Sequence, residues 1–480
     1  MNTLPLPTEL IIIIAEYLEP TFCLNFALAS SESWRVCKYL LQNHTLRFKK
    51  CGDLDITTVS LRQKLRELIS DPRKGWYYQR LVIPKLSTFW DEPHDEDCSL
   101  FHAEFDRIEI MYSRVRAQRT WLKLQNEGIR AHPEDRSDQN PFVDPMITVL
   151  VHYLPYLKVL TSPDFSTEGA LWAIMQSAVL AYSQANLSLA VQLPFQHLTT
   201  VVMTHEQHDQ NVGIDPGWVL LLNRIPSVRQ IAAEKMQWNF PLRNPGEDSS
   251  SIRLPESNVE EYFFVQSYLD PPTVQTILAS PKSIKRFTFE CNTLSLHLIS
   301  IWRETIEILR ERTGQTLEHL VLEVPTLSAA GSERLAETWI KSYTSVNRKR
   351  GTASKSSEFC TVSFRDFRVL KTLRTVWSIL WTDLLESSTL ASQLPDSLEV
   401  LDLEVHFFNE HEWKRLVIEL DGLFHVLPKL QSIYAEDPRY GHQYCKCRTN
   451  ELAEKPYTRI PGSNENPLMR LLRDSEVEAG

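Results

Sequence analysis

The hydrophobic pattern of the first forty or so residues predicts two short helices that cannot stand alone. Apolar side chains share one face of the first helix, at Ile11, Ile14, Ala15 and Leu18. Thr8 can cap this helix, and Pro20 ends it. The second helix is apolar on more than one face, so it needs partners on two sides. A unit of this size buries too little surface for a core of its own, and we expect it to dock on the rest of the chain or on another protein.

A block with apolar residues at offsets 0, 3 and 5 recurs along the chain after residue 155. The blocks start at Leu157, Leu198, Val228, Val259, Ile284, Leu317, Phe367, Leu398 and Leu430, and Tyr78 starts an outlying copy. Successive starts lie 25 to 50 residues apart. Apolar offsets 3 and 5 predict a short strand with one buried face, and the residues between many blocks have helical period. Strand, loop and helix in units of roughly thirty residues indicate a repeat protein.

Several copies of the block are degenerate, because Ser162 and Thr372 occupy offset 5. The βαβ units of an ordinary parallel sheet also space their strands by about thirty residues. A non-repetitive α/β domain therefore remains an alternative.

The chain between these two parts has a mixed pattern. Residues 61–69 predict an amphipathic helix, residues 81–83 a strand, and residues 101–125 a long charged helix. The segment 128–145 is polar and interrupted by prolines, so we interpret it as a loop and a soft domain boundary.

Composition and charge narrow the class of protein. The chain has 480 residues, a formal net charge of -10 and a pI near 5.8, which disfavour nucleic-acid binding as its main task. Its eight cysteines are mostly scattered, the N-terminus has no basic region ahead of the apolar run, and no apolar stretch is long enough to span a membrane. We expect free thiols and a location in the cytoplasm, the nucleus or both.

No residue pattern indicates catalysis. The glycine-rich phosphate loops and the nucleophile elbow of hydrolases do not occur. His205 and His208 are three residues apart, whereas a zinc-binding helix pair needs a spacing of four. His442, Cys445 and Cys447 form a tighter cluster, but a fourth ligand is not evident nearby. We therefore predict a protein that is not an enzyme, with no cofactor and no metal site.

The N-terminal residues resemble an F-box, the helical motif that binds the Skp-type adaptor of cullin ubiquitin ligases. The residues that carry this resemblance, and that it implies bind the adaptor, are Leu6, Pro7, Leu10, Ile14, Leu18, Leu24, Leu28 and Trp34. The match fades near Trp34, because the family commonly has a basic residue before the tryptophan and this chain has Ser31-Glu32-Ser33.

The later blocks resemble leucine-rich repeats, most clearly at Leu317 and Leu398, where the pattern LxxLxL is complete. An F-box followed by such repeats is similar to the architecture of many divergent fungal F-box proteins. The two resemblances together imply an α/β fold: a small all-α F-box at residues 1–48, a helical linker region at 49–150, an irregular leucine-rich-repeat-like solenoid at 151–440 and a C-terminal tail at 441–480.

This architecture implies the substrate receptor of a Skp-cullin-F-box ubiquitin ligase. The F-box would bind the adaptor, and hence the cullin scaffold, while the repeats would bind a protein substrate of unknown identity. Two alternatives stay open: a leucine-rich-repeat interaction scaffold whose N-terminal helices cap the repeats, and an enzyme built on an α/β sheet.

The repeat register also predicts a binding surface. If offsets 3 and 5 point inward, offsets 2, 4 and 6 point to the opposite face of the strands. Offset 6 is rich in glutamate, which suggests an acidic ridge for a basic partner segment. The candidate substrate-binding residues are Glu234, Glu290, Glu323, Glu404 and Glu436, with the apolar offset-4 neighbours Phe263 and Val321.

Overall fold

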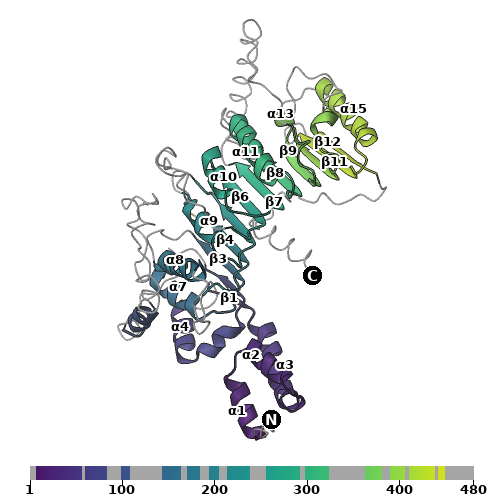
Figure 1. Cartoon of the computed structure of the whole chain (residues 1–480). Coiled ribbons are helices and arrows are strands. Elements are labelled where there is room, and N and C mark those ends of the chain that lie inside the picture. Colours follow the sequence, from purple (N-terminus) through teal and green to yellow (C-terminus); the bar gives the residue numbers. More distant parts are fainter. Residues whose placement is uncertain are drawn as a thin grey trace. The chain divides into compact units, whose positions relative to one another are not determined.

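The computed structural model of the chain divides into two compact units. Figure 1 labels its helices and strands. The described residues are 7–56, 60–83, 99–108, 143–163, 170–183, 194–204, 213–237, 256–291, 298–323, 363–380, 390–405, 410–437 and 442–448. The first unit comprises Met1–Glu206 and Ile225–Val228, and the second comprises Gln207–Arg224 and Arg229–Gly480.

The first unit starts with three helices and continues with strands and helices in alternation. Its elements are α1 (Thr8–Tyr17), α2 (Pro20–Leu28), α3 (Ser31–Cys51), β1 (Asp53–Asp55), α4 (Leu61–Ser70), the 3-10 helix η1 (Pro72–Tyr77), β2 (Arg80–Val82), α7 (Val143–His152), β3 (Val159–Pro163), α8 (Ala170–Ser183) and β4 (Thr200–Thr204). β1 to β4 pair in chain order, each parallel to the next in the pairs β1–β2, β2–β3 and β3–β4.

The second unit repeats the same alternation. Its elements are α9 (Gly217–Leu222), β5 (Gln230–Glu234), β6 (Glu261–Ser267), α10 (Pro271–Ile277), β7 (Arg286–Cys291), α11 (Leu298–Thr313), β8 (His319–Glu323), β9 (Thr372–Val376), α13 (Trp377–Leu380), α14 (Leu390–Gln393), β10 (Val400–Glu404), α15 (Glu410–Val426), β11 (Ser432–Asp437) and β12 (His442–Cys447). β5 to β11 pair in chain order and are parallel, and β12 returns antiparallel to β11.

Within each unit, every strand lies beside the strand that precedes it in the chain. Most parallel pairs are joined by a connection that contains a helix, and α10 and α11 pack against each other on one side of the strands (Figure 1). The predicted α/β class and the all-helical N-terminal region are therefore confirmed.

The predicted block register decides which side chains form the core. The offset-0, offset-3 and offset-5 side chains are buried in the blocks that start at Leu198, Val228, Val259, Ile284, Leu317, Leu398 and Leu430. In the first block, Leu157, Leu160 and Ser162 are buried in the same way. The alternation of side chains along each strand explains this result, because offsets 3 and 5 fall on the same face.

One block was predicted in the wrong register. Leu373 of β9 pairs with Leu320 of β8 and with Leu401 of β10, so Leu370 and not Phe367 is the first residue of this block. Three apolar residues spaced by three fit two registers, and a threonine stands at offset 5 in both, Thr372 in the predicted one and Thr375 in the observed one. The sequence pattern therefore could not distinguish them.

The ends of the first two helices also differ from the prediction. α1 starts at Thr8, so the cap position belongs to Pro7, and no side chain caps the helix. α1 ends because Leu18 has an extended backbone. Pro20 starts α2 instead of ending α1, which suits a residue that has no amide hydrogen to donate and a fixed φ.

The region at 49–150 contains more than helices. The predicted helix at 61–69 is α4, and the predicted strand at 81–83 is β2, which pairs with the unforeseen β1. The predicted loop at 128–145 is wrong at its end, because α7 begins at Val143 and tolerates Pro145 in its first turn. Residues 99–108 are helical, and the rest of the predicted helix at 101–125 lies outside the described residues.

Candidate functional site

The three N-terminal helices enclose a small core. Its buried members are Ile11, Ala15, Cys23, Ala27 and Cys37, and Leu18, Phe26, Val36, Leu40 and Leu41 pack against it partly buried. Burial raises the pKa of the Cys23 thiol to about 11, with a smaller effect from the neighbouring Cys37. Both thiols therefore stay protonated and act as small apolar groups of the core.

Most large apolar side chains of the three N-terminal helices lie outside that core. Eleven of the sixteen large apolar residues that are exposed within the described stretches lie between residues 10 and 46. They are Leu10, Ile12, Ile13, Ile14, Tyr17, Phe22, Leu24, Leu28, Trp34, Tyr39 and Leu46. Single exposed apolar residues are ordinary on a protein surface, whereas this concentration within one stretch of the sequence makes the three helices the candidate interaction site.

Most of the residues that the resemblance assigns to adaptor binding belong to this exposed surface. Pro7, Leu10, Ile14, Leu24, Leu28 and Trp34 are exposed, and Leu28 retains 67% of its accessible surface. Leu18 instead packs partly buried against the core of the three helices. Leu6 lies outside the described residues.

The resemblance did not assign six further residues to adaptor binding, although they are exposed on the same helices: Ile12, Ile13, Tyr17, Phe22, Tyr39 and Leu46. The signal for three of them was present in the run from Ile11 to Ile14 and in Tyr17. An isoleucine run is wider than one buried stripe of a helix, so the surplus side chains had to face solvent or a partner.

The stretch where the F-box resemblance fades forms a well-capped helix end. Ser30 caps α3, because its Oγ accepts a hydrogen bond of 3.0 Å from the backbone amide of Ser33. Glu32 in the first turn complements the positive end of the helix dipole. The serine-rich sequence before Trp34 therefore preserves the helix that displays the tryptophan.

Polar and aromatic contacts attach the three helices to the rest of the first unit. His44 Nδ1 lies 2.8 Å from the hydroxyl of Tyr77 in η1, and Phe48 packs edge-on against the Tyr77 ring. Tyr156 donates a hydrogen bond of 2.8 Å to Glu19 at the start of α2. These contacts involve the second half of α3 and the α1–α2 junction. The guanidinium of Arg73 also lies 5.8 Å from the centre of the Tyr17 ring, but Tyr17 stays 73% exposed.

A cluster of charged side chains lies on the face of the strands that is predicted to bind substrate. Arg374 of β9 lies 2.5 Å from a carboxylate oxygen of Glu323 and 3.6 Å from one of Asp402. Burial disfavours the charge of Arg374, but Glu323, Asp402, Glu404 and Glu290 outweigh it and raise the pKa of the guanidinium. Three of the five predicted glutamates, Glu290, Glu323 and Glu404, therefore gather around a cation of the chain itself.

The predicted substrate-binding residues differ in accessibility. Phe263 and Val321 retain 1% and 4% of their accessible surface, and Glu290 is also buried, so these three offer almost no area to a partner. Glu234, Glu323, Glu404 and Glu436 are half-buried. The strand register places Glu290 beside Glu323 and Glu404 beside Glu436, as the block pattern predicted, but Val376 and not Leu373 is the offset-6 residue of β9.

Metal-binding candidates from the sequence have no support in the described residues. No three residues of the types histidine, cysteine, aspartate and glutamate are grouped there so that they could hold an ion. Cys445 is exposed and Cys447 half-buried on β12. His205 and His208 lie outside the described part of the chain.

Comparison with known proteins adds no assignment: no family model matches the chain, and no curated protein matches its sequence. Within the described stretches, no helix has the length and apolar character needed to cross a bilayer.

Proposed function

We propose that this protein is the substrate receptor of a Skp-cullin-F-box ubiquitin ligase. α1, α2 and α3 bind the Skp-type adaptor, and a surface of the later repeats binds the protein to be ubiquitinated. The protein contributes no catalytic group. It raises the effective concentration of substrate lysines near the conjugating enzyme that the cullin scaffold holds.

The observation that carries this proposal is the exposed apolar surface of the three N-terminal helices. The buried core of these helices takes up none of Leu10, Ile14, Leu24, Leu28 and Trp34, which remain exposed where the F-box resemblance expects contacts. Burying a large apolar side chain completely is worth about 1.5 to 3 kcal/mol. Five half-exposed residues can therefore supply several kcal/mol towards the cost of association.

The order of the strands supports the second half of the proposal. Parallel strands that pair in chain order and are joined by short helical connections are the expected form of leucine-rich repeats. A doubly wound α/β enzyme would reverse its strand order and bind its ligand at the switch point. Within each of the two units, the described strands contain no such reversal.

Truncating the apolar surface tests the adaptor assignment. Leu10 and Ile14 are exposed at 45% and 38%, so the double variant Leu10→Ala/Ile14→Ala leaves the core intact. We expect a loss of about 2 kcal/mol or more in binding, that is at least about thirtyfold, and loss of the adaptor during co-purification.

Ile418→Ala is the matched control, because Ile418 is an exposed isoleucine on α15. It should retain the adaptor at the wild-type level. Undiminished recovery of the adaptor with Leu10→Ala/Ile14→Ala would overturn the assignment.

A further inference from the structure

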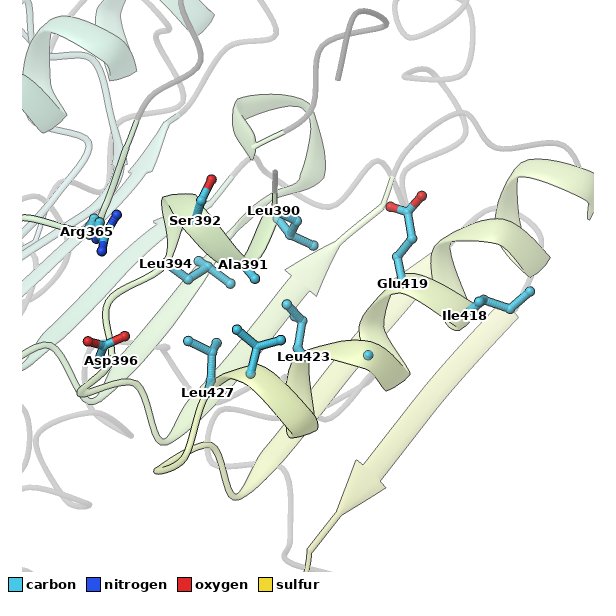
Figure 2. Close-up of a pocket in the computed structure, with 12 residues that line it drawn as sticks. Arg365, Leu390, Ala391, Ser392, Leu394, Asp396, Ile418, Glu419, Leu423 and Leu427 are labelled. Carbon is cyan, nitrogen blue, oxygen red and sulfur yellow. The ribbon is translucent and has the colours of Figure 1, made fainter. Parts of the chain in front are cut away.

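An apolar groove of about 630 Å³ lies between α14 and α15 in the second unit. Figure 2 shows Leu390 and Leu394 facing Leu423 and Leu427 across it. This volume is in the range of pockets that bury several side chains of a ligand. All the residues that line the groove belong to the second unit.

Gly422 lines this groove and leaves space in it, because glycine has no side chain. It stands in the interior of α15, where glycine costs about 1 kcal/mol relative to alanine. A Cβ atom at this position would meet no other atom within 4 Å. Val426, one turn further along and 60% exposed, also lines the groove. The helix thus presents a notch beside an uncovered apolar residue.

A buried carboxylate stands at the rim of the groove. The Glu419 side chain retains 7% of its accessible surface, and its Oε1 lies 3.3 Å from Nε of Arg415. Its second oxygen, Oε2, is buried and has no hydrogen-bond partner among the described residues. Burial raises the pKa of this carboxyl despite Arg415. An arriving cation would satisfy the free oxygen.

The chain leaves the described part of the second unit at the C-terminal end of this same helix. Arg448, the last described residue, donates hydrogen bonds of 2.6 Å and 2.9 Å to the carbonyl oxygens of Phe424 and Leu427. Tyr444 and Lys446 of β12 both donate to Asp421. Arg448 therefore contacts the backbone of Leu427, a residue that lines the groove, and the following chain starts beside the groove.

The sequence after Arg448 contains one segment whose chemistry fits the groove. In Asn466-Pro467-Leu468-Met469-Arg470-Leu471-Leu472-Arg473, four apolar residues alternate with two arginines at helical spacing, behind a helix-starting Asn-Pro pair. Nineteen residues, 449–467, separate Leu468 from Arg448. Such a connection spans up to about 60 Å when extended, whereas α15 is only about 25 Å long.

We propose that Leu468–Arg473 of the same chain occupies the groove between α14 and α15. Its apolar residues cover Leu423, Leu427 and the notch at Gly422, and one of its arginines pairs with Glu419. The segment would then cover apolar side chains of α14 and α15, and because it is tethered it has an advantage in effective concentration over any free competitor.

Zero-length carbodiimide cross-linking of the full chain tests this contact. In the variant Arg470→Lys/Arg473→Lys we expect a cross-link between Glu419 and one of the new lysines, mapped by mass spectrometry. The cross-link should fall at least tenfold when Glu419→Gln or Gly422→Leu is added. Gly422→Leu fills the notch, and it should preserve or raise helix stability because leucine is the better helix former.

Mixing light and heavy-isotope protein identifies the source of the segment. Cross-links within one isotope class support the proposal, whereas mixed light–heavy cross-links would mean that a second copy supplies the segment and would overturn it. Absence of any cross-link to Glu419 would also overturn it.

Hydrogen exchange of the otherwise unaltered chain gives an independent readout. Leu468→Asp/Leu471→Asp should speed amide exchange in residues 418–427 at least threefold, while Val477→Asp, outside the segment, should not. Equal exchange in wild type and Leu468→Asp/Leu471→Asp would contradict the proposal.

Discussion

Neighbouring apolar residues of α1 differ in burial. Ile11 and Ala15 are buried in the core, while Ile12, Ile13 and Ile14 are exposed on the same helix. Replacing one of the exposed isoleucines by alanine should therefore change binding much more than it changes the free energy of unfolding. This separation makes the N-terminal surface accessible to mutational tests.

We expect the free energy of unfolding to depend on pH because of the partly buried His44. Burial, with a smaller effect from Arg47, lowers the pKa of His44 below its ordinary value of 6.5. As the pH falls, the unfolded chain therefore binds the proton before the folded chain does, and the stability that neutral His44 contributes is lost below about pH 6.5. The contact of His44 with Tyr77 should weaken in the same range.

Urea unfolding at pH 7.5 and pH 5.5 measures this effect. The wild type should lose more free energy of unfolding between the two pH values than His44→Gln, which cannot take up the proton. An equal loss in both proteins would show that His44 does not contribute.

At the scale of elements, the strands were easier to predict than their accessible surfaces. The LxxLxL blocks at Leu317 and Leu398 locate β8 and β10, because one buried face imposes a period of two. The register predicted for the block at Phe367 was wrong, because its apolar residues repeat every three positions and fit two registers. Phe263 and Val321 look like surface anchors by strand alternation, but tertiary packing, which a strand pattern does not contain, buries them.

Arg374 holds together the carboxylates of β7 to β10. Arg374→Met would remove the guanidinium that stabilises the charges of Glu290, Glu323, Asp402 and Glu404, and we expect a loss of about 3 kcal/mol in the free energy of unfolding. Chemical denaturation measures it. Glu323→Gln added to Arg374→Met should recover part of the loss.

Arg310→Met is the control for this prediction, because Arg310 lies 3.9 Å from Asp366 in a largely exposed ion pair. Its effect should stay below about 0.5 kcal/mol. If Arg374→Met were equally mild, the cluster would not depend on the arginine.

At the scale of the whole molecule, the sequence predicts the class of elements and the position of the N-terminal surface better than the remaining sites. A local helical pattern and the F-box resemblance single out Pro7, Leu10, Leu24 and Trp34 in the sequence, and all four are exposed; their role in adaptor binding stays a prediction. The groove at Gly422 could not be predicted, because its walls come from two helices whose facing residues Leu390 and Leu423 lie 33 positions apart in the sequence, and it depends on how these helices pack.

The central claim is that the N-terminal helices bind the ligase while the later strands and helices bind the substrate. Affinity purification with mass spectrometry, comparing the full chain with a deletion of residues 1–45, tests both halves together. We predict that the full chain recovers a Skp-type adaptor, a cullin and a set of substrate proteins, and that the deletion loses the adaptor and cullin but retains the substrates. Recovery of neither adaptor nor cullin with the full chain would contradict the claim.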